Sequence, residues 1–385
     1  MDAQQQQGAR NERLPRLATA LGTLKSLRWF ISNTWTYLMR GTTAKAERTA
    51  WFDLRSNVFH RYLLDLMLML NDQGYAIRMR FHPGAVATWN TSLLLQFVPR
   101  FRFHLRERPA PHDLRFSDRP GTPGVMVLDP DYFQREPLPA LSYVVPMPMV
   151  DSIYAKGLHA WTPDLDRIDR ARKIFFVGNV SPEYAASEEI IGEVFGCFTR
   201  PQLIDHVERL FPERIHRPHN ATDLYKDGPQ DIVLIDRKRF NIPHEELRAV
   251  MARHDLFLAP AGVIMPLCHN LTEAMSVGCI PVLQHAHLMH PPLKDRVNCL
   301  AYRDVAGLRA ALVEVQHMSG EDVLAMRRNV LSYYQKYLSP EAVVGSLEHG
   351  KGRLTRVHLN AEHLSVDLLR KRAGRLGPPS DRDRA

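Results

Sequence analysis

Between residues 173 and 337, short apolar segments alternate with segments of helical spacing, and this alternation limits the fold more than any other feature of the sequence. Four apolar runs have the length and composition of buried strands: KIFFVGN (173–179), DIVLID (231–236), DLFLAP (255–260) and IPVLQ (280–284). Helix-like segments separate or follow them, at 199–211, 243–254, 304–317 and 319–337. The alternation predicts an α/β domain with a parallel, doubly wound sheet and right-handed crossovers.

A second α/β region precedes this one and is less regular. AWFDL (50–54) and YAIRMRF (75–81) have the pattern of strands, and the apolar spacing of 58–73 between them predicts a helix that ends at Gly74. Three more candidate strands follow among many prolines, at 101–105, 124–129 and 141–148. We therefore expect a smaller domain with short elements.

The 385 residues are enough for two domains of ordinary size. The pattern predicts five parts: an N-terminal extension with a basic amphipathic helix (1–49), a first α/β domain (50–165), a second α/β domain (166–337), a helical segment (338–366) and a disordered basic tail (367–385). We find no internal repeat.

The net charge of +8 belongs to the two ends of the chain. Residues 1–50 carry eight Lys or Arg against three Asp or Glu, and residues 367–385 carry six against three, so the remainder is neutral. A nucleic-acid enzyme usually shows a basic stripe across its folded body. The charge distribution therefore argues against nucleic acid as a partner.

Cysteine usage and hydropathy indicate the compartment. The four cysteines include no C-x-x-C pair, which fits a reducing environment. No apolar run reaches the 18 or so residues of a membrane span, and the N-terminus lacks the apolar core of a secretory signal. We expect a cytoplasmic protein.

Residues 14–39 have apolar side chains at three- and four-residue steps with interspersed Arg and Lys, and they include Trp29, Phe30 and Trp35. A basic amphipathic helix of this kind can lie on an anionic membrane surface. It can equally pack against the body of the protein, and the sequence leaves both readings open. The first would make the protein peripheral on the inner face of the plasma membrane.

The loops after the strands of the second domain are rich in His, Arg, Asn and Gly. Ligands of open parallel sheets bind beyond the carboxyl ends of the strands, so these loops indicate a phosphate-bearing ligand. No strand is followed by G-x-G-x-x-G and no G-x-x-x-x-G-K-[ST] occurs, which disfavours a dinucleotide dehydrogenase and a P-loop enzyme. No D-x-D follows a strand of this half to hold a metal–diphosphate.

Glu273 stands three residues after Asn270, at the start of the apolar stretch CHNLTEAMSVGCIPVL (268–283). One interpretation is a capping box, in which Asn270 caps a helix and Glu273 reaches back to its backbone N–H. The other is a ligand contact, because a helix that directly follows a strand opens at the ligand edge of the sheet. There, a carboxylate of the first turn can accept hydrogen bonds from ribose hydroxyls.

The stretch HNLTEAMSVGCIPVLQ (269–284), followed by PPLKDRVNCLAYRD (291–304) and two closing helices, resembles the donor-binding half of GT-B glycosyltransferases. It is most similar to exostosin-like and related bacterial surface-polysaccharide enzymes, with their E-A-x-x-x-G-C-I-P-V element. The resemblance covers roughly residues 170–335. It implies two Rossmann-like domains with mostly parallel sheets facing across a cleft, a nucleotide-sugar donor in the second, an acceptor in the first, and neither cofactor nor metal.

The resemblance also implies donor-binding residues. In the family the glutamate approaches the ribose or diphosphate, and the glycine lets the helix turn into the next strand. Cationic side chains after DIVLID would stabilise the diphosphate leaving group. The candidates are His269, Asn270, Glu273, Gly178, Asn179, Arg237 and Lys238, with Arg239 beside them.

Inversion at the anomeric carbon needs a general base from a strand-end loop of the first domain. Asp53 and His60 flank the first such loop and are the catalytic candidates. His82 ends the second strand, and Arg55 is a candidate phosphate contact.

Three histidines, His285, His287 and His290, have a metal-like spacing, H-x-H-x-x-H. They lack a carboxylate partner and a clear helix. We expect loop histidines there, one of which contacts the donor, and no metal site.

The leading hypothesis is a metal-independent glycosyltransferase that extends a saccharide or a lipid-linked glycan. Two alternatives stay open. One is a nucleotide-sugar epimerase of the same architecture. The other is a catalytically inactive GT-B-like module that binds or assembles components of an envelope polysaccharide pathway.

Overall fold

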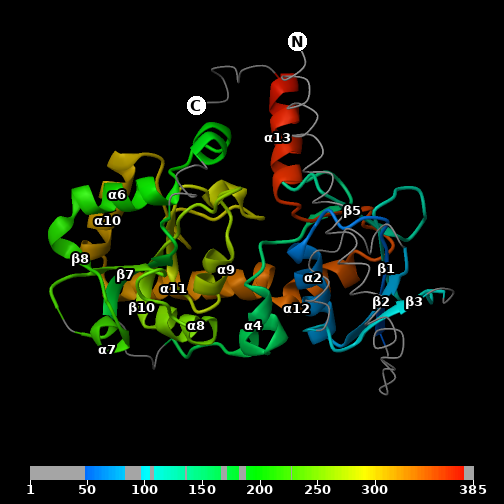
Figure 1. Ribbon diagram of the computed structural model, residues 1–385, viewed down its shortest axis with the longest axis horizontal. Helices are drawn as coiled ribbons and strands as arrows, with labels where there is room; N and C mark the ends of the chain where they lie inside the picture. Colours follow the sequence, from blue (N-terminus) through cyan, green and yellow to red (C-terminus); the bar gives the residue numbers. More distant parts are fainter. Residues whose placement is uncertain are drawn as a thin grey trace, which may run out of the picture. The chain divides into compact units, whose positions relative to one another are not determined.

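The computed structural model describes residues 48–82, 97–104, 108–134, 137–165, 171–181, 188–226 and 228–376 (Figure 1). The amphipathic segment 14–39 lies outside the described residues. The chain divides into two compact units. The first takes the chain up to Tyr132, Leu138–Tyr143 and Val344–Ala361, and the second takes the rest.

The first unit is built on a seven-stranded sheet of order β3-β2-β1-β4-β5-β13-β6. The strands are β1 (Arg48–Asp53), β2 (Tyr75–Arg80), β3 (Phe101–His104), β4 (Leu114–Ser117), β5 (Met126–Asp129), β6 (Ser142–Val144) and β13 (Arg356–His358). From β3 to β13 each neighbouring pair is parallel. Helix α2 (Arg61–Asp72) packs on this sheet with nine successive buried residues, Tyr62–Leu70, which explains its almost uninterrupted apolar sequence.

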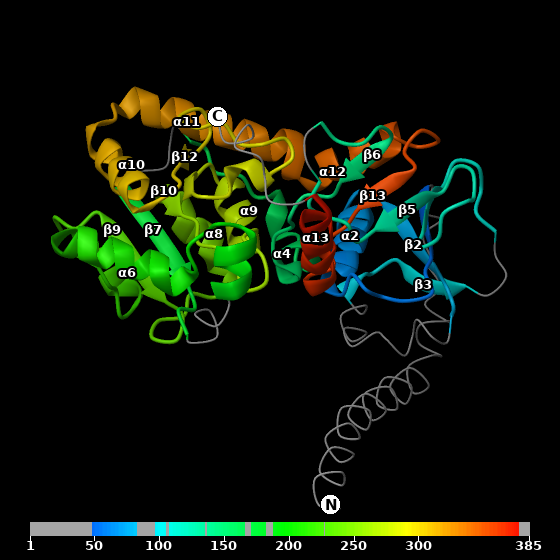
Figure 2. The ribbon, with the colours of Figure 1, turned by 90° about the horizontal axis from the view of Figure 1, so that it is seen from above.

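The second unit has a six-stranded sheet of order β12-β11-β10-β7-β9-β8, and all its pairings are parallel. The strands are β7 (Ala171–Gly178), β8 (Ile215–His216), β9 (Ile232–Asp236), β10 (His254–Leu258), β11 (Ile280–Leu283) and β12 (Leu300–Ala301). In Figure 2, β10, β7 and β9 lie side by side in the middle of this unit. Their apolar side chains are fully buried, as expected for strands covered on both faces.

The α-helices of the second unit are α4 (Asp151–Ala155), α6 (Arg200–Leu210), α7 (Ala221–Leu224), α8 (His244–Ala252), α9 (His269–Met275), α10 (Val305–His317), α11 (Gly320–Tyr333) and α13 (His363–Leu376); α12 (Pro340–His349) bridges the division between the units. Four of them, α6, α7, α10 and α11, begin at residues whose side chains cap them. Thr199 and Gln202 form a capping box at α6, and the side chains of Asp304 and Ser319 cap α10 and α11. Short π-helical turns cover Glu189–Val194 and Tyr334–Leu338.

Two predictions about the C-terminal region are wrong. The segment 338–366 contains a strand, β13, which pairs with β5 of the first unit's sheet and is therefore not helical throughout. Residues 367–376, expected to be disordered, belong to α13, where Arg370 pairs with Glu189 and Arg372 donates to the carbonyl of Phe133. Within the described part of the chain, no helix has the length and hydropathy needed to cross a membrane.

The two parallel sheets confirm the predicted fold class. The chain is an α/β protein with two Rossmann-like units.

Candidate functional site

Each sheet has one point where the strand order reverses. In the first unit the chain builds β2 and β3 on one side of β1 and then places β4 on the other side. In the second unit it builds β9 and β8 on one side of β7 and β10 on the other. Ligands of doubly wound sheets bind outside the carboxyl ends of the strands at such points. The places to inspect are therefore the carboxyl ends of β1 and β4 in the first unit and of β7 and β10 in the second. We call them the β1/β4 edge and the β7/β10 edge.

At the β7/β10 edge, helix α9 follows β10 and is tied to β7. The N-cap of α9 is Cys268, and Asn270 lies inside the helix. The buried amide of Asn270 donates from Nδ2 to the carbonyl of Val177 at 3.1 Å. The predicted capping box is therefore wrong: Asn270 holds the start of α9 against the end of β7 instead of capping the helix.

Glu273 lies in the second turn of α9, one turn later than predicted, and is 1% exposed. Its Oε1 accepts a hydrogen bond from the backbone N–H of Val150 at 3.2 Å. Its Oε2 is buried and accepts no hydrogen bond from the described residues. Burial raises the pKa of Glu273 to about 7, against the opposing effects of the Val150 hydrogen bond, Arg248 and Arg237. Glu273 thus offers one unused acceptor oxygen near two cations.

Arg237 follows β9 and is held in place by its neighbours. Nε and Nη2 donate to Oδ1 of Asn241 at 3.2 and 3.1 Å, and Nη2 lies 3.2 Å from Nε2 of His244. A guanidinium can only donate, so His244 accepts as a neutral imidazole. Burial, and next the charge of Arg237, lower the pKa of His244 below its usual value, which favours this form.

His269 belongs to the same group of side chains. Its ring centroid lies 6.5 Å from that of His244. The structure thus places Arg237 and His269, two of the predicted donor-binding residues, beside His244, and the charge of Arg237 acts on Glu273. The sequence analysis treated His244 only as part of a helix start. The available signal was its place at the first residue of α8, three residues after Asn241 in the loop that follows β9.

Gly178 ends β7, Asn179 follows it, and together they accommodate a buried arginine that the sequence analysis missed. A Cβ at Gly178 would lie 3.0 Å from Nη1 of Arg200. Arg200, 6% exposed, donates from Nη1 to the carbonyl of Asn179 at 3.1 Å. Its Nη2 lies 3.5 Å from the carbonyl of Ala261. The lack of a side chain at Gly178 therefore leaves room for Arg200, which links the loops after β7 and β10.

The remaining predicted cation of this edge, Lys238, has an exposed side chain, and its backbone N–H donates to Oδ1 of Asp236 at 3.1 Å. Arg239 is also exposed.

The loop histidines after β11 do not form a metal site with carboxylates or cysteines in the part of the chain that the structure describes. His285 is 1% exposed, and burial lowers its pKa to about 3, so it is neutral. Burial, and next Arg303, also lower the pKa of His287.

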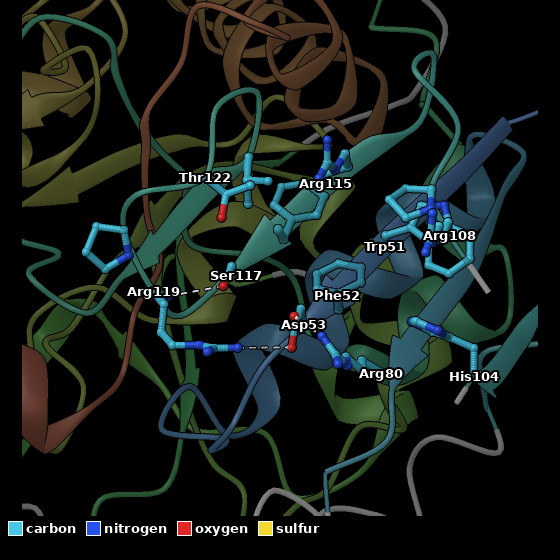
Figure 3. Close-up of a pocket in the computed structure, with 14 residues that line it drawn as sticks. Trp51, Phe52, Asp53, Arg80, His104, Arg108, Arg115, Ser117, Arg119 and Thr122 are labelled. Atoms are coloured by element: carbon cyan, nitrogen blue, oxygen red, sulfur yellow. Dashed lines mark hydrogen bonds and ion pairs between the residues drawn. The ribbon is translucent and has the colours of Figure 1, made fainter. Parts of the chain in front are cut away.

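At the β1/β4 edge, the first unit has a pocket of about 600 Å³ (Figure 3). It lies at the carboxyl ends of four neighbouring strands, where Asp53, Arg80, His104 and Ser117 are the last residues of β1, β2, β3 and β4. All four of these residues line the pocket, with Trp51 and Phe52 of β1 beside them. A volume of this size is typical of small-molecule sites.

Asp53 is the carboxylate of this pocket, and its neighbours are His82 and two arginines. Its Oδ1 lies 2.7 Å from Nε2 of His82 and 3.5 Å from Nη2 of Arg119, and its Oδ2 lies 3.1 Å from Nη1 of Arg80. Burial alone would raise the pKa of Asp53, but hydrogen bonds from His82 and Arg80 outweigh it and hold the pKa below its usual value. Asp53 is therefore ionised at neutral pH and orients His82.

The other predicted catalytic residue is His60, and neither it nor His82 is among the residues that line this pocket. His60 is the exposed N-cap of α2, has φ 49°, and makes no capping hydrogen bond with its side chain. Arg55 also has an exposed side chain, and its backbone N–H donates to Oδ2 of Asp118 at 2.7 Å. Of the histidines considered, the structure pairs His82 with Asp53.

Neither a scan against models of protein families nor a search of curated proteins finds a match to this sequence. Among solved structures, HepE from Anabaena in complex with UDP aligns at a TM-score of 0.37 and 12% identity, over 78% of this chain and 98% of HepE. A glycosyltransferase from Rickettsia africae aligns at 0.39 and 8%, over 79% and 98% of the two chains. Trehalose-6-phosphate synthase OtsA aligns at 0.33 and 13%, over 86% and 76%. The assignment of two Rossmann-like units rests on the two parallel sheets themselves.

Proposed function

We propose that the chain is a glycosyltransferase that transfers a sugar from a nucleotide-sugar donor to a saccharide or lipid-linked acceptor, without a metal. The observation that supports this most is the cluster of Glu273, Arg237, His244 and His269 at the β7/β10 edge. It combines a buried oxygen that can accept hydrogen bonds from a ribose with a guanidinium, fixed by its neighbours, that can pair with a diphosphate.

In the proposed reaction, the second unit binds the donor and the first supplies the base. Glu273 accepts hydrogen bonds from the ribose hydroxyls, and Arg237 and Lys238 stabilise charge on the departing nucleoside diphosphate. Gly178 and Asn179 let the backbone after β7 approach the donor. As the acceptor oxygen bonds to the anomeric carbon, the bond from that carbon to the diphosphate breaks.

His82 takes the proton of the acceptor hydroxyl in an inverting transfer, and Asp53 orients the imidazole and stabilises its protonated form. The hydrogen bond of 2.7 Å between them supports this assignment over His60.

Donor binding is tested by thermal-shift measurements of the full chain with UDP-, GDP-, ADP- and CMP-sugars. We expect one class to stabilise the protein, by about 2.7 kcal/mol at a hundredfold excess over its Kd. Arg237→Gln should weaken this stabilisation. Arg209→Gln, which changes a side chain 73% exposed on α6, should not. No stabilisation by any of the four would contradict donor binding.

Turnover separates the proposal from its alternatives. A transferase releases nucleoside diphosphate faster when an acceptor is added. An epimerase would release free sugar and nucleotide without one, and an inactive binding module would bind without turnover. The assay is release of nucleoside diphosphate with and without a panel of glycan acceptors.

The predicted membrane contact through residues 14–39 remains part of the proposal, with a cytoplasmic location. Flotation of the full chain and of a chain lacking residues 1–45 with anionic liposomes tests it. Loss of flotation in the shortened chain is the expected result, and unchanged flotation would contradict it.

A further inference from the structure

The pocket of the first unit carries more positive charge than its own carboxylate can balance. Four arginines line it, Arg80, Arg108, Arg115 and Arg119, together with His104, against the single carboxylate of Asp53. These side chains come from β2, β3, β4 and the loops after β3 and β4, and they surround the pocket in Figure 3. Such convergence of one sign of charge at a switch point is a feature of ligand sites.

The carboxylate of the pocket already has ion-pair partners, whereas two of the four arginines have no carboxylate partner among the described residues. Asp53 is shared by Arg80, Arg119 and His82. Among the described residues, no carboxylate lies within ion-pair distance of Arg108 or Arg115. Arg115 is half-buried on β4, where a guanidinium without a counterion is less well solvated than at the surface. An anion in the pocket would supply the missing partner.

The apolar walls of the pocket indicate what else the ligand carries. Trp51 lies at the pocket and is fixed by two contacts: Nε1 donates to Oδ2 of the buried Asp113 at 2.7 Å, and its ring meets His104 edge-on at 4.5 Å. Phe116, Pro109 and Pro120 add further apolar surface. A rigid aromatic side chain beside cations suits an organic molecule with an anionic group rather than a free inorganic ion.

We infer that this pocket binds an acceptor that carries a phosphate group, with Arg108 and Arg115 as its principal phosphate contacts. Guanidinium groups bind phosphate oxygens bidentately, which gives both affinity and orientation. The inference rests on the proposed function, since it names the chemical class of the acceptor for the same reaction. Asp53 lines this pocket and holds His82, so a phosphate bound by the two arginines brings the remainder of the acceptor to the catalytic pair.

The phosphate can come from two sources with the same chemistry, a soluble sugar phosphate or a lipid-linked sugar diphosphate. Calorimetric titration of the full chain with glucose 1-phosphate, with farnesyl diphosphate in detergent and with methyl glucoside distinguishes them. We expect one of the two phosphate probes to bind and methyl glucoside not to bind. Binding should weaken as ionic strength rises.

Variants locate the binding site. The double variant Arg108→Gln/Arg115→Gln should weaken phosphate binding at least tenfold, and the single variant Arg108→Gln, in an exposed loop, should weaken it in the same direction. The double variant Arg108→Lys/Arg115→Lys should bind with intermediate affinity, because lysine keeps the positive charge but cannot make the bidentate contact of a guanidinium. Arg209→Gln on α6 is the control, and circular dichroism establishes that each variant is folded.

The donor site must be kept apart from this one, because it also attracts phosphate. Arg237→Gln changes the donor site only. It should therefore leave phosphate binding in the pocket of the first unit unchanged, whereas Arg108→Gln/Arg115→Gln should weaken that binding. Equal affinity of the folded Arg108→Gln/Arg115→Gln variant and the unsubstituted chain, or equally tight binding of methyl glucoside, would overturn the inference. If phosphate binds here while no nucleotide-sugar stabilises the protein, the proposed function fails and the phosphate site stands.

Discussion

Oε1 of Glu273 lies 3.2 Å from the backbone nitrogen of Val150, a residue 123 positions earlier in the chain. The hydrogen bond ties α9 to the segment that leads into α4 (Asp151–Ala155). It satisfies one oxygen of a fully buried carboxyl group and leaves the other for a ligand or a proton. The consequence is a pKa of about 7, well above that of an exposed glutamate.

This raised pKa predicts that stability falls with rising pH. Glu273 has a pKa of about 7 in the folded protein and about 4.5 when exposed, so between these values the folded state binds a proton that the unfolded state releases. The free energy of unfolding should therefore fall from pH 4.5 to 7, by roughly 3 kcal/mol, and level off above. Glu273→Gln should flatten this dependence.

Urea unfolding followed by circular dichroism at several pH values measures the effect. Glu321→Gln, which changes an exposed carboxylate in the first turn of α11, is the matched control and should keep the pH dependence. An identical pH dependence in Glu273→Gln and the unsubstituted chain would show that Glu273 titrates normally.

Most of the second sheet could be predicted from the sequence, because its strands are buried on both faces and appear as uninterrupted apolar runs. β8 was missed because it has only two residues, Ile215–His216. β4 was missed although Leu114 and Phe116 alternate with polar residues, because the run has only four residues among prolines. β13 pairs with β5, with Arg356 opposite Val127. A local sequence pattern cannot predict a pairing between segments so far apart in the chain.

In the candidate site too, features set by neighbouring residues could be predicted from the sequence, and contacts between distant residues could not. The buried position of Glu273 follows from its apolar neighbours, but its hydrogen bond to Val150 depends on the tertiary fold. Likewise, the sequence placed Asp53 and His82 at strand ends, and only the pairing of β1 with β2 brings them within 2.7 Å. Strand-end position can be read from a sequence; the choice of partner across the sheet cannot.

The pairing of Asp53 with His82 predicts which histidine is catalytic. His82→Ala and Asp53→Asn should each lower kcat, by about 10²-fold or more for the base. Because the pKa of Asp53 lies below its usual range, the carboxylate is ionised at neutral pH, so Asp53→Asn removes a negative charge that is present during the assay. Initial rates of nucleoside diphosphate release measure both.

His60→Gly is the matched control for this assignment. It removes an imidazole at a position with φ 49°, where glycine is favoured, and so avoids new backbone strain. Its kcat should remain close to that of the unsubstituted chain. If His60→Gly abolishes turnover while His82→Ala retains it, the assignment is reversed.

Gly278 ends α9 with φ +70°, which agrees with the predicted turn of the helix into the next strand. A Cβ there would lie 3.1 Å from Cδ2 of Leu165 and 3.4 Å from the carbonyl oxygen of Arg327. Gly278→Ala should therefore destabilise the protein by about 1–3 kcal/mol, through backbone strain and crowding together. Gly345→Ala, with open space around the added Cβ, is the control in the same unfolding measurement, and equal stability of the two variants would contradict this account.

Arg327 of α11 and Asp255 of β10 form an ion pair in the core of the second unit, where the arginine side chain is 1% exposed. Nη2 of Arg327 also lies 3.4 Å from the carbonyl oxygen of Val277. Removing one partner leaves the other charge buried, which typically costs about 3–5 kcal/mol, whereas replacing both costs far less. Arg327→Met should therefore lower the free energy of unfolding by that amount, and Asp255→Asn/Arg327→Met should recover most of the loss. Urea unfolding of the two variants beside the unsubstituted chain measures this, and additive losses in the double variant would show that the two side chains act independently.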